Sequence, residues 1–567
     1  MSKLGNPANC TLNQTSRTGL EIKQQNPACV PRRPWFRFAM FCCLLVMMSA
    51  LRFAAQQKEN EQTEQSEPTV EKSGKLKLPE GQKSGEVQKE SAKEKEAQKE
   101  VLPVVTHHEI HINGRVLRYT ATTGLMPIRN GETDEVEANI FFMAYTLDNA
   151  SPPRPLMFSF NGGPGAASVW LHLGAIGPRR VKMLPDGGMP PPPFELIDNP
   201  QTWLDQTDLV FIDPVGTGYS RATKKEFAKK FLGVKGDIAS VGEFIRLYLS
   251  RYQRWTSPLF LVGESYGTTR AAGLSGYLVG RGVALSGVVL VSSVLNFETL
   301  AFTRGNDLPY ILYLPSYAAT AWYHKKLPSD LQQRDLQNVL REAEQFAAGP
   351  YAAALGKGDN LTPQERDSLV EQVSRFTGLE RSVVSEHDMR ITQGVFCHEL
   401  LRSQRLQVGR LDGRFTAPDI SDVRAEGYYD PAESIVRPPF TSTFNNYVRS
   451  ELGYKTDLEY YVLGGGFNMG EWDWGSAQQG FPDTSEALRL AFVKNPYMKL
   501  FVASGYYDLA TPYFATQYTL SHMKLDAPEH AKVSLGYYDA GHMMYIRSKS
   551  LDRLHQDVSS FLANALK

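Results

Sequence analysis

The sequence predicts an α/β protein with a mostly parallel central sheet, helices on both faces of the sheet and an inserted, mainly helical cap. Two observations support this prediction. Short apolar stretches of strand character alternate with helical stretches over residues 208–295 and again from residue 499 to the C-terminus. This alternation is typical of parallel sheets whose strands are joined by helices. Between the two regions, residues 297–495 are richer in helix-like stretches, as expected of an insertion.

Length and charge limit the classes of protein that fit. The chain has 567 residues, with 61 basic and 61 acidic side chains. That length accommodates one large domain with an insertion, and the balanced charge gives no indication of a nucleic-acid partner. We therefore expect no nucleic-acid binding and divide the chain into four parts. They are an N-terminal segment, 1–55, a charged linker, 56–103, a sheet domain, 104–296 and 496–567, and the cap, 297–495.

An apolar run from Phe38 to Leu51 lies in the N-terminal segment, with Arg37 before it and Arg52 after it. The run is shorter than the ~20 residues of a membrane-spanning helix and suits the core of a signal peptide. No two small residues there have the spacing of a cleavage site, so an uncleaved anchor through residues 35–55 stays an alternative. We expect an exported protein, periplasmic or secreted, with or without this membrane attachment.

The linker and the cysteines are consistent with this expectation. From Gln56 to Glu100 the chain is mostly Lys, Glu, Gln and Ser without an aromatic residue, and such a segment cannot bury enough apolar surface to become ordered. Four of the five cysteines precede the linker, which leaves Cys397 alone in the folded region. One thiol cannot form a disulfide within that region, so we expect its stability to come from a large core.

The expected elements follow in chain order. Residues 107–120 alternate in polarity around an Asn-Gly pair, which predicts a β-hairpin. His107, Glu109 and His111 share one face of its first strand; exposed strand polarity explains them better than a metal site, and we expect neither metal nor cofactor. The other strands are expected at 138–147 and 154–160, as a pair, and at 208–214, 259–262, 287–295, 499–505 and 532–538, with helices at 238–255, directly after 267, at 513–523 and at 548–566.

Residues 263–267 read GESYG, directly after an apolar strand and directly before a helix. A Gly-x-Ser-x-Gly pattern in this position forms the sharp turn that lifts a serine hydroxyl clear of a sheet. The flanking glycines are needed because the turn is strained and leaves no room for Cβ atoms. Ser265 is therefore the candidate nucleophile, and the N-terminus of the helix favours the developing negative charge.

A nucleophilic serine needs a base, and the base needs an orienting carboxylate. Asp508 and His542 each follow one of the last two predicted strands, which gives the chain order nucleophile, acid, histidine. Asp539 is too near His542 in sequence for the usual acid loop. The other histidines of this region fit helices or the start of a strand: His522, His530 and His555. We predict a catalytic triad of Ser265, Asp508 and His542.

A second glycine-rich segment, SFNGGPG at 159–165, also follows a predicted strand. Glycines there let backbone N–H groups approach a substrate closely, as an oxyanion hole requires. A tight Pro-Gly turn without function is the alternative interpretation. The GTG sequence at 216–218 lacks the third glycine of a dinucleotide-binding loop, so it predicts no nucleotide cofactor.

Together these motifs resemble the serine carboxypeptidase family. NGGPG, a Gly-Pro turn at 177–178, FIDPVGTGYS, GESYG, the segment around Asp508 and AGHM at 540–543 occur in the family's order, and the resemblance spans residues 105–567. It implies an α/β-hydrolase fold and release of single residues from peptide or protein C-termini through an acyl-enzyme on Ser265. The alternative is an esterase or acyltransferase with the same triad, because fold does not fix function. The intact motif set argues against a non-catalytic binding protein.

The resemblance also assigns roles beside the triad. They are the oxyanion hole, at Gly163 and the N–H of Tyr266; the clamp for the substrate's terminal carboxylate, at Asn161, the N–H of Gly162 and Glu264; and the leaving-residue pocket, at Met543. Glu264 must be protonated to donate to an anion, which requires a raised pKa. The sequence departs from the family at Ser159, where a tryptophan is usual, and at Ala175, where a glutamate partner of Glu264 is usual. The family's disulfides are missing too.

Overall fold

The computed structural model describes residues 101–151, 153–420, 429–464, 471–475 and 480–567. The expected signal peptide or anchor at 1–55 and the linker up to residue 100 lie outside the described residues. The described residues belong to one compact unit, Glu96–Lys567. Within these ranges, no helix combines the length and apolar character needed to cross a membrane.

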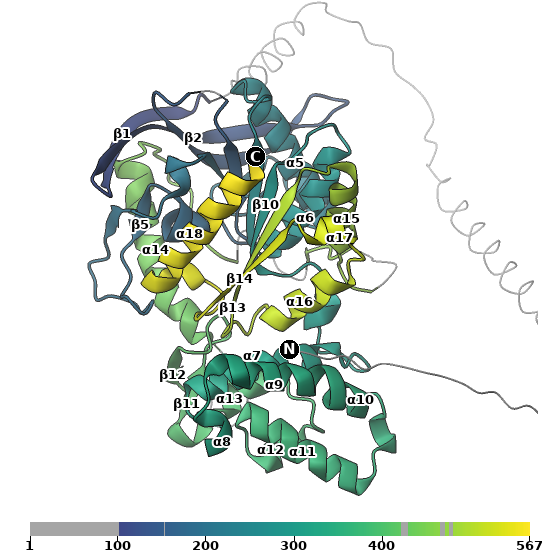
Figure 1. The fold of residues 1–567 in the computed structure, drawn as a ribbon. Helices are drawn as coiled ribbons and strands as arrows, with labels where there is room; N and C mark the ends of the chain where they lie inside the picture. The colour runs from purple at the N-terminus through teal and green to yellow at the C-terminus, as the bar shows by residue number, and fades with distance from the viewer. Residues whose placement is uncertain (1–100, 152, 421–428, 465–470, 476–479) are drawn as a thin grey trace, which may run out of the picture. The chain divides into compact units, whose positions relative to one another are not determined.

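A ten-stranded sheet forms the centre of this unit (Figure 1). Its strands lie in the order β1-β2-β3-β7-β4-β9-β10-β13-β14, and β8 pairs with β3. Pairing is antiparallel from β1 to β7 and parallel from β7 to β14, which confirms the predicted α/β class. The bounds are β1 Val104–Ile112, β2 Arg115–Arg129, β3 Val136–Leu147, β4 Leu156–Phe160, β7 Asp208–Ile212, β8 Arg221–Ala222, β9 Leu259–Ser265, β10 Gly287–Ser293, β13 Lys499–Gly505 and β14 Val533–Tyr538.

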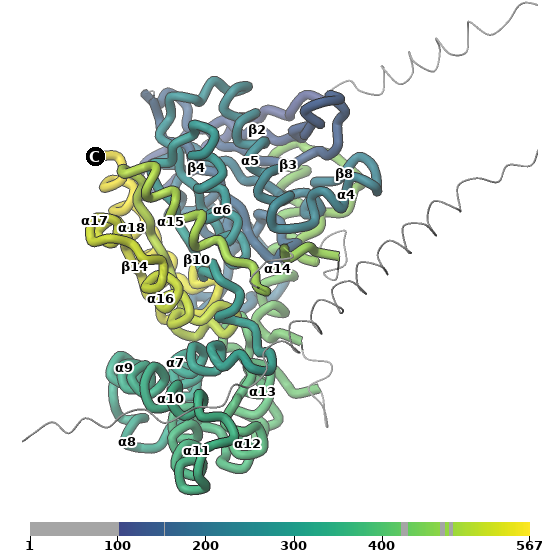
Figure 2. Tube along the Cα trace, turned by 90° about the vertical axis from the view of Figure 1, so that its right-hand side faces the viewer, coloured from purple at the N-terminus to yellow at the C-terminus, as the bar shows by residue number. Residues whose placement is uncertain are grey.

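Helices cover both faces of the sheet (Figures 1 and 2). Those of the sheet domain are α3 Val169–Leu171, α4 Lys225–Phe231, α5 Val234–Arg251, α6 Tyr266–Val279, α14 Pro431–Ser450, α15 Ser485–Lys494, α16 Tyr513–His522, α17 Ala527–His530 and α18 Ser548–Ala565. Within β9, Phe260 and Val262 pack into the core under α18, whereas Leu261 packs into the core under α5, α6 and α15. Because both faces are buried, such strands have continuous apolar sequences, the pattern that predicted them.

Two strand expectations had different outcomes. β1 and β2 form the predicted hairpin, with Asn113 at φ +49° and Gly114 at φ +73° in the turn, and the polar residues His107, Glu109 and His111 are exposed on β1. The expected pairing of β3 with β4 is wrong. β7 lies between them, antiparallel to β3 and parallel to β4. The fully buried β7 fills the space between two strands that are adjacent in sequence, and local sequence pattern does not specify such a crossover.

A separate set of helices follows β10 and has a hydrophobic core of its own (Figure 1). We call it the helical unit: α7 Leu308–Tyr323, α8 Ser329–Gln332, α9 Leu336–Phe346, α10 Ala352–Leu355, α11 Pro363–Thr377, α12 Arg381–Glu386, α13 Gln393–Glu399 and the ribbon of β11 Leu406–Val408 and β12 Thr416–Pro418. Cys397 is buried in this core. The rest of the expected cap differs, because α14 and α15 pack into the two cores of the sheet domain, for example through Phe440 and Leu488.

Candidate active site

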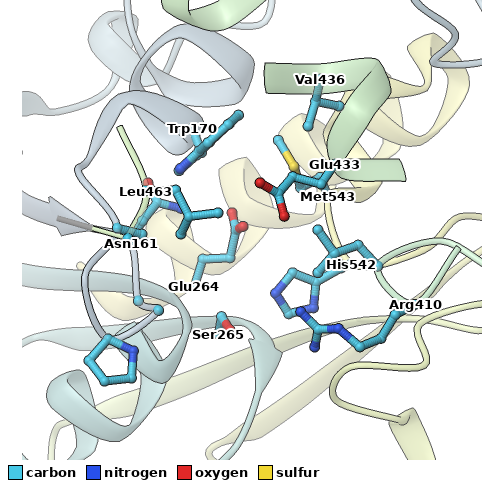
Figure 3. Close-up of a pocket in the computed structure, with 16 residues that line it drawn as sticks. Asn161, Trp170, Glu264, Ser265, Arg410, Glu433, Val436, Leu463, His542 and Met543 are labelled. Atoms are coloured by element: carbon cyan, nitrogen blue, oxygen red, sulfur yellow. The ribbon is translucent and has the colours of Figure 1, made fainter. Parts of the chain in front are cut away.

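Ser265 lies at the turn between β9 and α6, with φ +59° and ψ −131°, a strained conformation for a residue with a side chain. The flanking glycines allow this turn to close. A Cβ on Gly263 would lie 2.1 Å from the carbonyl oxygen of Gly267, and a Cβ on Gly267 would lie 2.9 Å from that of Phe160. Glycine is therefore required at both positions, and the turn presents Ser265 to a cavity (Figure 3).

Asp508 and His542 follow the ends of β13 and β14, and His542 lines this cavity. Nδ1 of His542 lies 2.8 Å from Oδ2 of Asp508. The Asp508 carboxylate is fully buried and accepts the N–H groups of Ala510, at 2.8 Å, and Thr511, at 2.9 Å, and the Thr511 hydroxyl at 2.8 Å. These bonds fix the carboxylate. The Nδ1–H of His542 accordingly donates to Asp508, and Nε2 is the basic nitrogen.

The surroundings of His542 favour its protonated form. Burial lowers the pKa of His542, but the charge of Asp508, the hydrogen bond to Asp508 and the charge of Glu264 raise it, against a smaller lowering by Arg410. The net result is a pKa above the usual value for histidine. A base of this kind can hold the proton that a serine loses during nucleophilic attack.

The cavity has a volume of ≈ 300 Å³, and its wall contains Ser265 and His542. The wall also contains the other side chains and glycines that the sequence placed at the site: Asn161, Gly162, Gly163, Glu264 and Met543. Tyr266 was predicted to contribute its backbone N–H, and its ring points elsewhere, with the hydroxyl 3.2 Å from Oδ2 of the buried Asp237. The alternative histidines do not line this cavity; His522 and His530 are exposed, and His555 lies on α18.

The NGGPG turn packs directly against the start of α6. A Cβ on Gly162 would lie 2.4 Å from the backbone nitrogen of Tyr266, and Gly163 has φ +95°, which favours glycine. This close approach brings the backbone of Gly163 to the same side of the cavity as the helix N-terminus. The geometry suits an oxyanion hole made from the N–H groups of Gly163 and Tyr266, a role that stays a prediction.

Asn161 and Glu264 supply hydrogen-bond donors to the cavity. Oδ1 of Asn161 accepts the N–H of Leu171 at 3.0 Å, and the buried Asn161 side chain lies beside the carboxyl group of Glu264. Burial raises the pKa of Glu264 to about 7, although the charge of His542 and hydrogen bonds with Tyr545 and Asn161 each lower it in part. Glu264 is therefore mostly protonated below pH 7. An amide and a carboxylic acid side by side suit the binding of a carboxylate.

Comparison with known proteins shows a family to which part of this chain is similar. Residues 115–341 match the model of a family described as serine carboxypeptidase. Over this segment the chain is similar to the serine carboxypeptidase family. The matched segment contains Ser265, Glu264 and Asn161, and it ends before Asp508 and His542. In the structure His542 lines the same cavity, and Asp508 is hydrogen-bonded to His542.

Curated members of the serine carboxypeptidase family share part of their length with this chain. A serine carboxypeptidase of Dictyostelium discoideum is 26% identical over 252 residues, which cover 43% of this chain and 53% of that protein. A serine carboxypeptidase-like protein of Arabidopsis thaliana is 31% identical over 182 residues, 30% of this chain and 35% of that protein. The chain thus spans about half or less of these relatives. A solved pro-hormone-processing carboxypeptidase of Saccharomyces cerevisiae has a TM-score of 0.47 and 17% identity, covering 78% of this chain and 91% of its own.

The two departures from the serine carboxypeptidase pattern can be located. Oγ of Ser159 is buried without a protein partner among the described residues. Ala175 is buried in the π-helical turn His172–Ile176. Tyr545 packs against this turn, since a Cβ on Gly174 would lie 2.5 Å from its ring, and its hydroxyl donates to Oε2 of Glu264 at 2.6 Å. A tyrosine hydroxyl is thus the partner of Glu264 in a chain that lacks the family's second carboxyl group.

Other residues of the cavity were missed by the sequence analysis. Trp170 and Val436 form an apolar side together with the predicted Met543, and the charged groups of Arg410 and Glu433 point into the cavity beside them (Figure 3). Trp170 follows NGGPG closely in sequence, so proximity could have suggested it. Arg410 and Glu433 lie in the middle of the insertion, where no motif marks them.

Proposed function

We propose that this protein is a serine-type carboxypeptidase that hydrolyses C-terminal peptide bonds. The observation that supports this function is one cavity that combines a nucleophile and base, Ser265 and His542, with two carboxylate-binding donors, Asn161 and Glu264. An esterase needs the first pair alone, because its substrates have no terminal carboxylate. The second pair restricts the enzyme to substrates with a free C-terminus and sets the scissile bond one residue from it.

The reaction follows from this arrangement. Nε2 of His542 accepts the proton of Ser265 as Oγ forms a bond to the carbonyl carbon, and the N–H groups of Gly163 and Tyr266 stabilise the oxyanion. Collapse breaks the peptide bond, and His542 gives its proton to the leaving amine. Water then attacks the acyl-enzyme with His542 as the base, which frees the shortened peptide and restores Ser265. Asp508 keeps His542 in the required tautomer throughout.

Blocked dipeptides with free or amidated C-termini test the substrate class. We expect cleavage of the free acids at a kcat/KM at least about 100-fold above that of the amides, since an amide leaves Glu264 and Asn161 without a charged acceptor. Products would be measured by mass spectrometry. Equal cleavage of both series would overturn the proposal, and hydrolysis of small esters without any peptide cleavage would favour an esterase or acyltransferase.

The pH dependence of KM tests the clamp. The pKa of Glu264 is raised to about 7, so the acid form that donates to the substrate is present below pH 7 and is lost above it. We expect KM for a blocked dipeptide to rise roughly tenfold per pH unit above pH 7, because ionised Glu264 repels the substrate's carboxylate. The matched variant Glu264→Gln keeps a donor that does not ionise, and its KM should stay level from pH 6 to pH 8.5. A rising KM in that variant would contradict this role.

Tyr545→Phe should extend the range of tight binding to higher pH. The Tyr545 hydroxyl donates to Glu264 and lowers the pKa of that carboxyl. Without it, the pKa of Glu264 rises, the protonated form persists, and the increase of KM should begin up to about one pH unit higher. KM–pH profiles of the two proteins measured side by side would show this shift. A shift to lower pH would mean that Tyr545 stabilises the protonated form instead.

We further propose that the chain is exported. The apolar run from Phe38 to Leu51 between Arg37 and Arg52 supports this. N-terminal sequencing of the protein from its host would distinguish a cleaved signal peptide from an uncleaved anchor.

A further inference from the structure

A short segment of the insertion, Gly409–Gly413, runs between the two loops that hold Asp508 and His542. Its backbone bonds to the residues on either side of Asp508: the N–H of Gly413 donates to the carbonyl of Tyr507 at 2.9 Å, and the N–H of Leu509 donates to the carbonyl of Arg410 at 3.0 Å. It also reaches the other loop, because the N–H of His542 donates to the carbonyl of Leu411 at 2.6 Å. This segment therefore contacts both halves of the acid–base pair.

Asp412 makes the side-chain contact with the histidine loop. Its Oδ2 accepts the N–H of Gly541, the residue before His542, at 3.0 Å. Arg414 holds the same carboxylate through two bonds, Nε to Oδ1 at 2.9 Å and a terminal nitrogen to Oδ2 at 2.6 Å. Both side chains are buried, with exposed fractions of 4% and 7%. A buried, bidentate ion pair fixes the position and orientation of its carboxylate.

Gly541 packs so closely against Leu411 and Asp412 that the two segments cannot move independently. A Cβ on Gly541 would lie 2.4 Å from the carbonyl oxygen of Leu411 and 2.5 Å from Cα of Asp412. The histidine loop thus lies directly on the segment, and displacement of one displaces the other.

A second buried carboxylate fixes the start of the segment. Asp430, the N-cap of α14, accepts the N–H groups of Arg410 at 3.1 Å and Leu411 at 2.9 Å as well as that of Ala432 at 3.0 Å. Since α14 packs into the core of the sheet domain through Phe440, this bond ties the segment to a rigid element. The segment is therefore held at its start by the carboxylate of Asp430 and near its end by its own Asp412.

We infer that Asp412 is a positioning residue of the active site: through Gly541 and the segment Gly409–Gly413 it sets the distance and orientation of His542 relative to Asp508. The insertion then contributes to the chemical step, by positioning His542, as well as forming part of the cavity wall. This inference rests on the proposed triad and does not depend on which substrate the triad cleaves.

The variant Asp412→Asn tests this inference. It keeps the volume of the side chain and weakens the pair with Arg414, so His542 is held less well. We expect kcat on a blocked dipeptide and the rate of fluorophosphonate labelling of Ser265 to fall together by about 10- to 100-fold, with KM changed less than about twofold. Three charged groups face His542, namely Asp508, Glu264 and Arg410. A looser contact with Asp508 lowers the pKa of His542, so the acid limb of the labelling rate should move to lower pH.

A matched control exists in the helical unit. Asp307 forms a bidentate pair with Arg390 at 2.7 and 3.0 Å, away from both catalytic loops. Asp307→Asn should lower the melting temperature without changing kcat, labelling rate or acid limb. If Asp412→Asn matches this control in all three, the inference is wrong. If Asp412→Asn does not fold, Arg414→Lys takes its place, because it keeps the charge but loses the bidentate geometry. This variant should show a smaller loss of labelling rate and the same shift of the acid limb to lower pH. A labelling rate and an acid limb equal to those of the wild type would refute the inference.

Fluorophosphonate labelling of Ser265 tests the role of Asp412 independently of the proposed carboxypeptidase activity. A wild-type protein that labels at Ser265 but cleaves no peptide would refute the carboxypeptidase, and the labelling rates of the variants would still decide the role of Asp412.

Discussion

Ser265→Ala is expected to lower kcat on a blocked dipeptide by about 10⁵- to 10⁶-fold and to abolish fluorophosphonate labelling. The turn between β9 and α6 presents one hydroxyl to the cavity at this point, and no acyl-enzyme forms without it. The remaining rate would come from the oxyanion hole and from substrate binding, which the substitution leaves in place. KM should therefore change little. Burst kinetics and intact-protein mass spectrometry would measure the loss.

Ser275→Ala provides the control for this substitution. Ser275 is buried on the same helix, α6, where its hydroxyl donates to the carbonyl of Ala272 at 2.7 Å. This variant should label and cleave at the wild-type rate. Substantial cleavage by Ser265→Ala would contradict the assignment of the nucleophile.

Asp508→Asn should cost about 10⁴-fold in kcat. The carboxylate accepts the Nδ1–H of His542 and three further bonds from Ala510 and Thr511. An amide at this place presents its N–H₂ to Nδ1, which favours the wrong tautomer and removes the charge that raises the pKa of His542. The acid limb of the activity should accordingly move to lower pH. Rates of labelling and of peptide cleavage, both followed against pH, would measure the two effects.

Asp539→Asn is the matched substitution at the competing carboxylate. Asp539 is three residues from His542 in sequence, yet its side chain is exposed. We expect wild-type activity from this variant. A loss comparable to that of Asp508→Asn would transfer the orienting role to Asp539.

The sequence predicted the parts of this structure that are encoded locally. Strands buried on both faces have continuous apolar runs, and Ser265, Asp508 and His542 lie at the ends of such strands, so they could be proposed as a triad from the sequence. The order of strands in the sheet is set by packing between distant segments, which is why the position of β7 between β3 and β4 was missed.

The site residues that the sequence did not predict were missed for a similar reason. Arg410, Asp412 and Glu433 come from an insertion between β10 and β13, and only the folded chain brings them to the cavity or to the catalytic loops. Tyr545 is three residues from His542, but a tyrosine in this place has many ordinary roles. Its hydrogen bond to Glu264 becomes visible only with the turn at Gly174 against which it packs.

The separate core of the helical unit has a consequence for the redox behaviour of the protein. Cys397 is the sole cysteine of residues 101–567 and is buried in that core. Reducing or oxidising conditions therefore cannot make or break a cross-link within the folded region, so its order is insensitive to the thiol balance of its surroundings. A thiol reagent can reach Cys397 only when this group of helices opens, while the sheet, with its own two cores, can stay intact. The chain thus contains a natural chemical reporter of local unfolding on the side of the molecule that supplies Asp412.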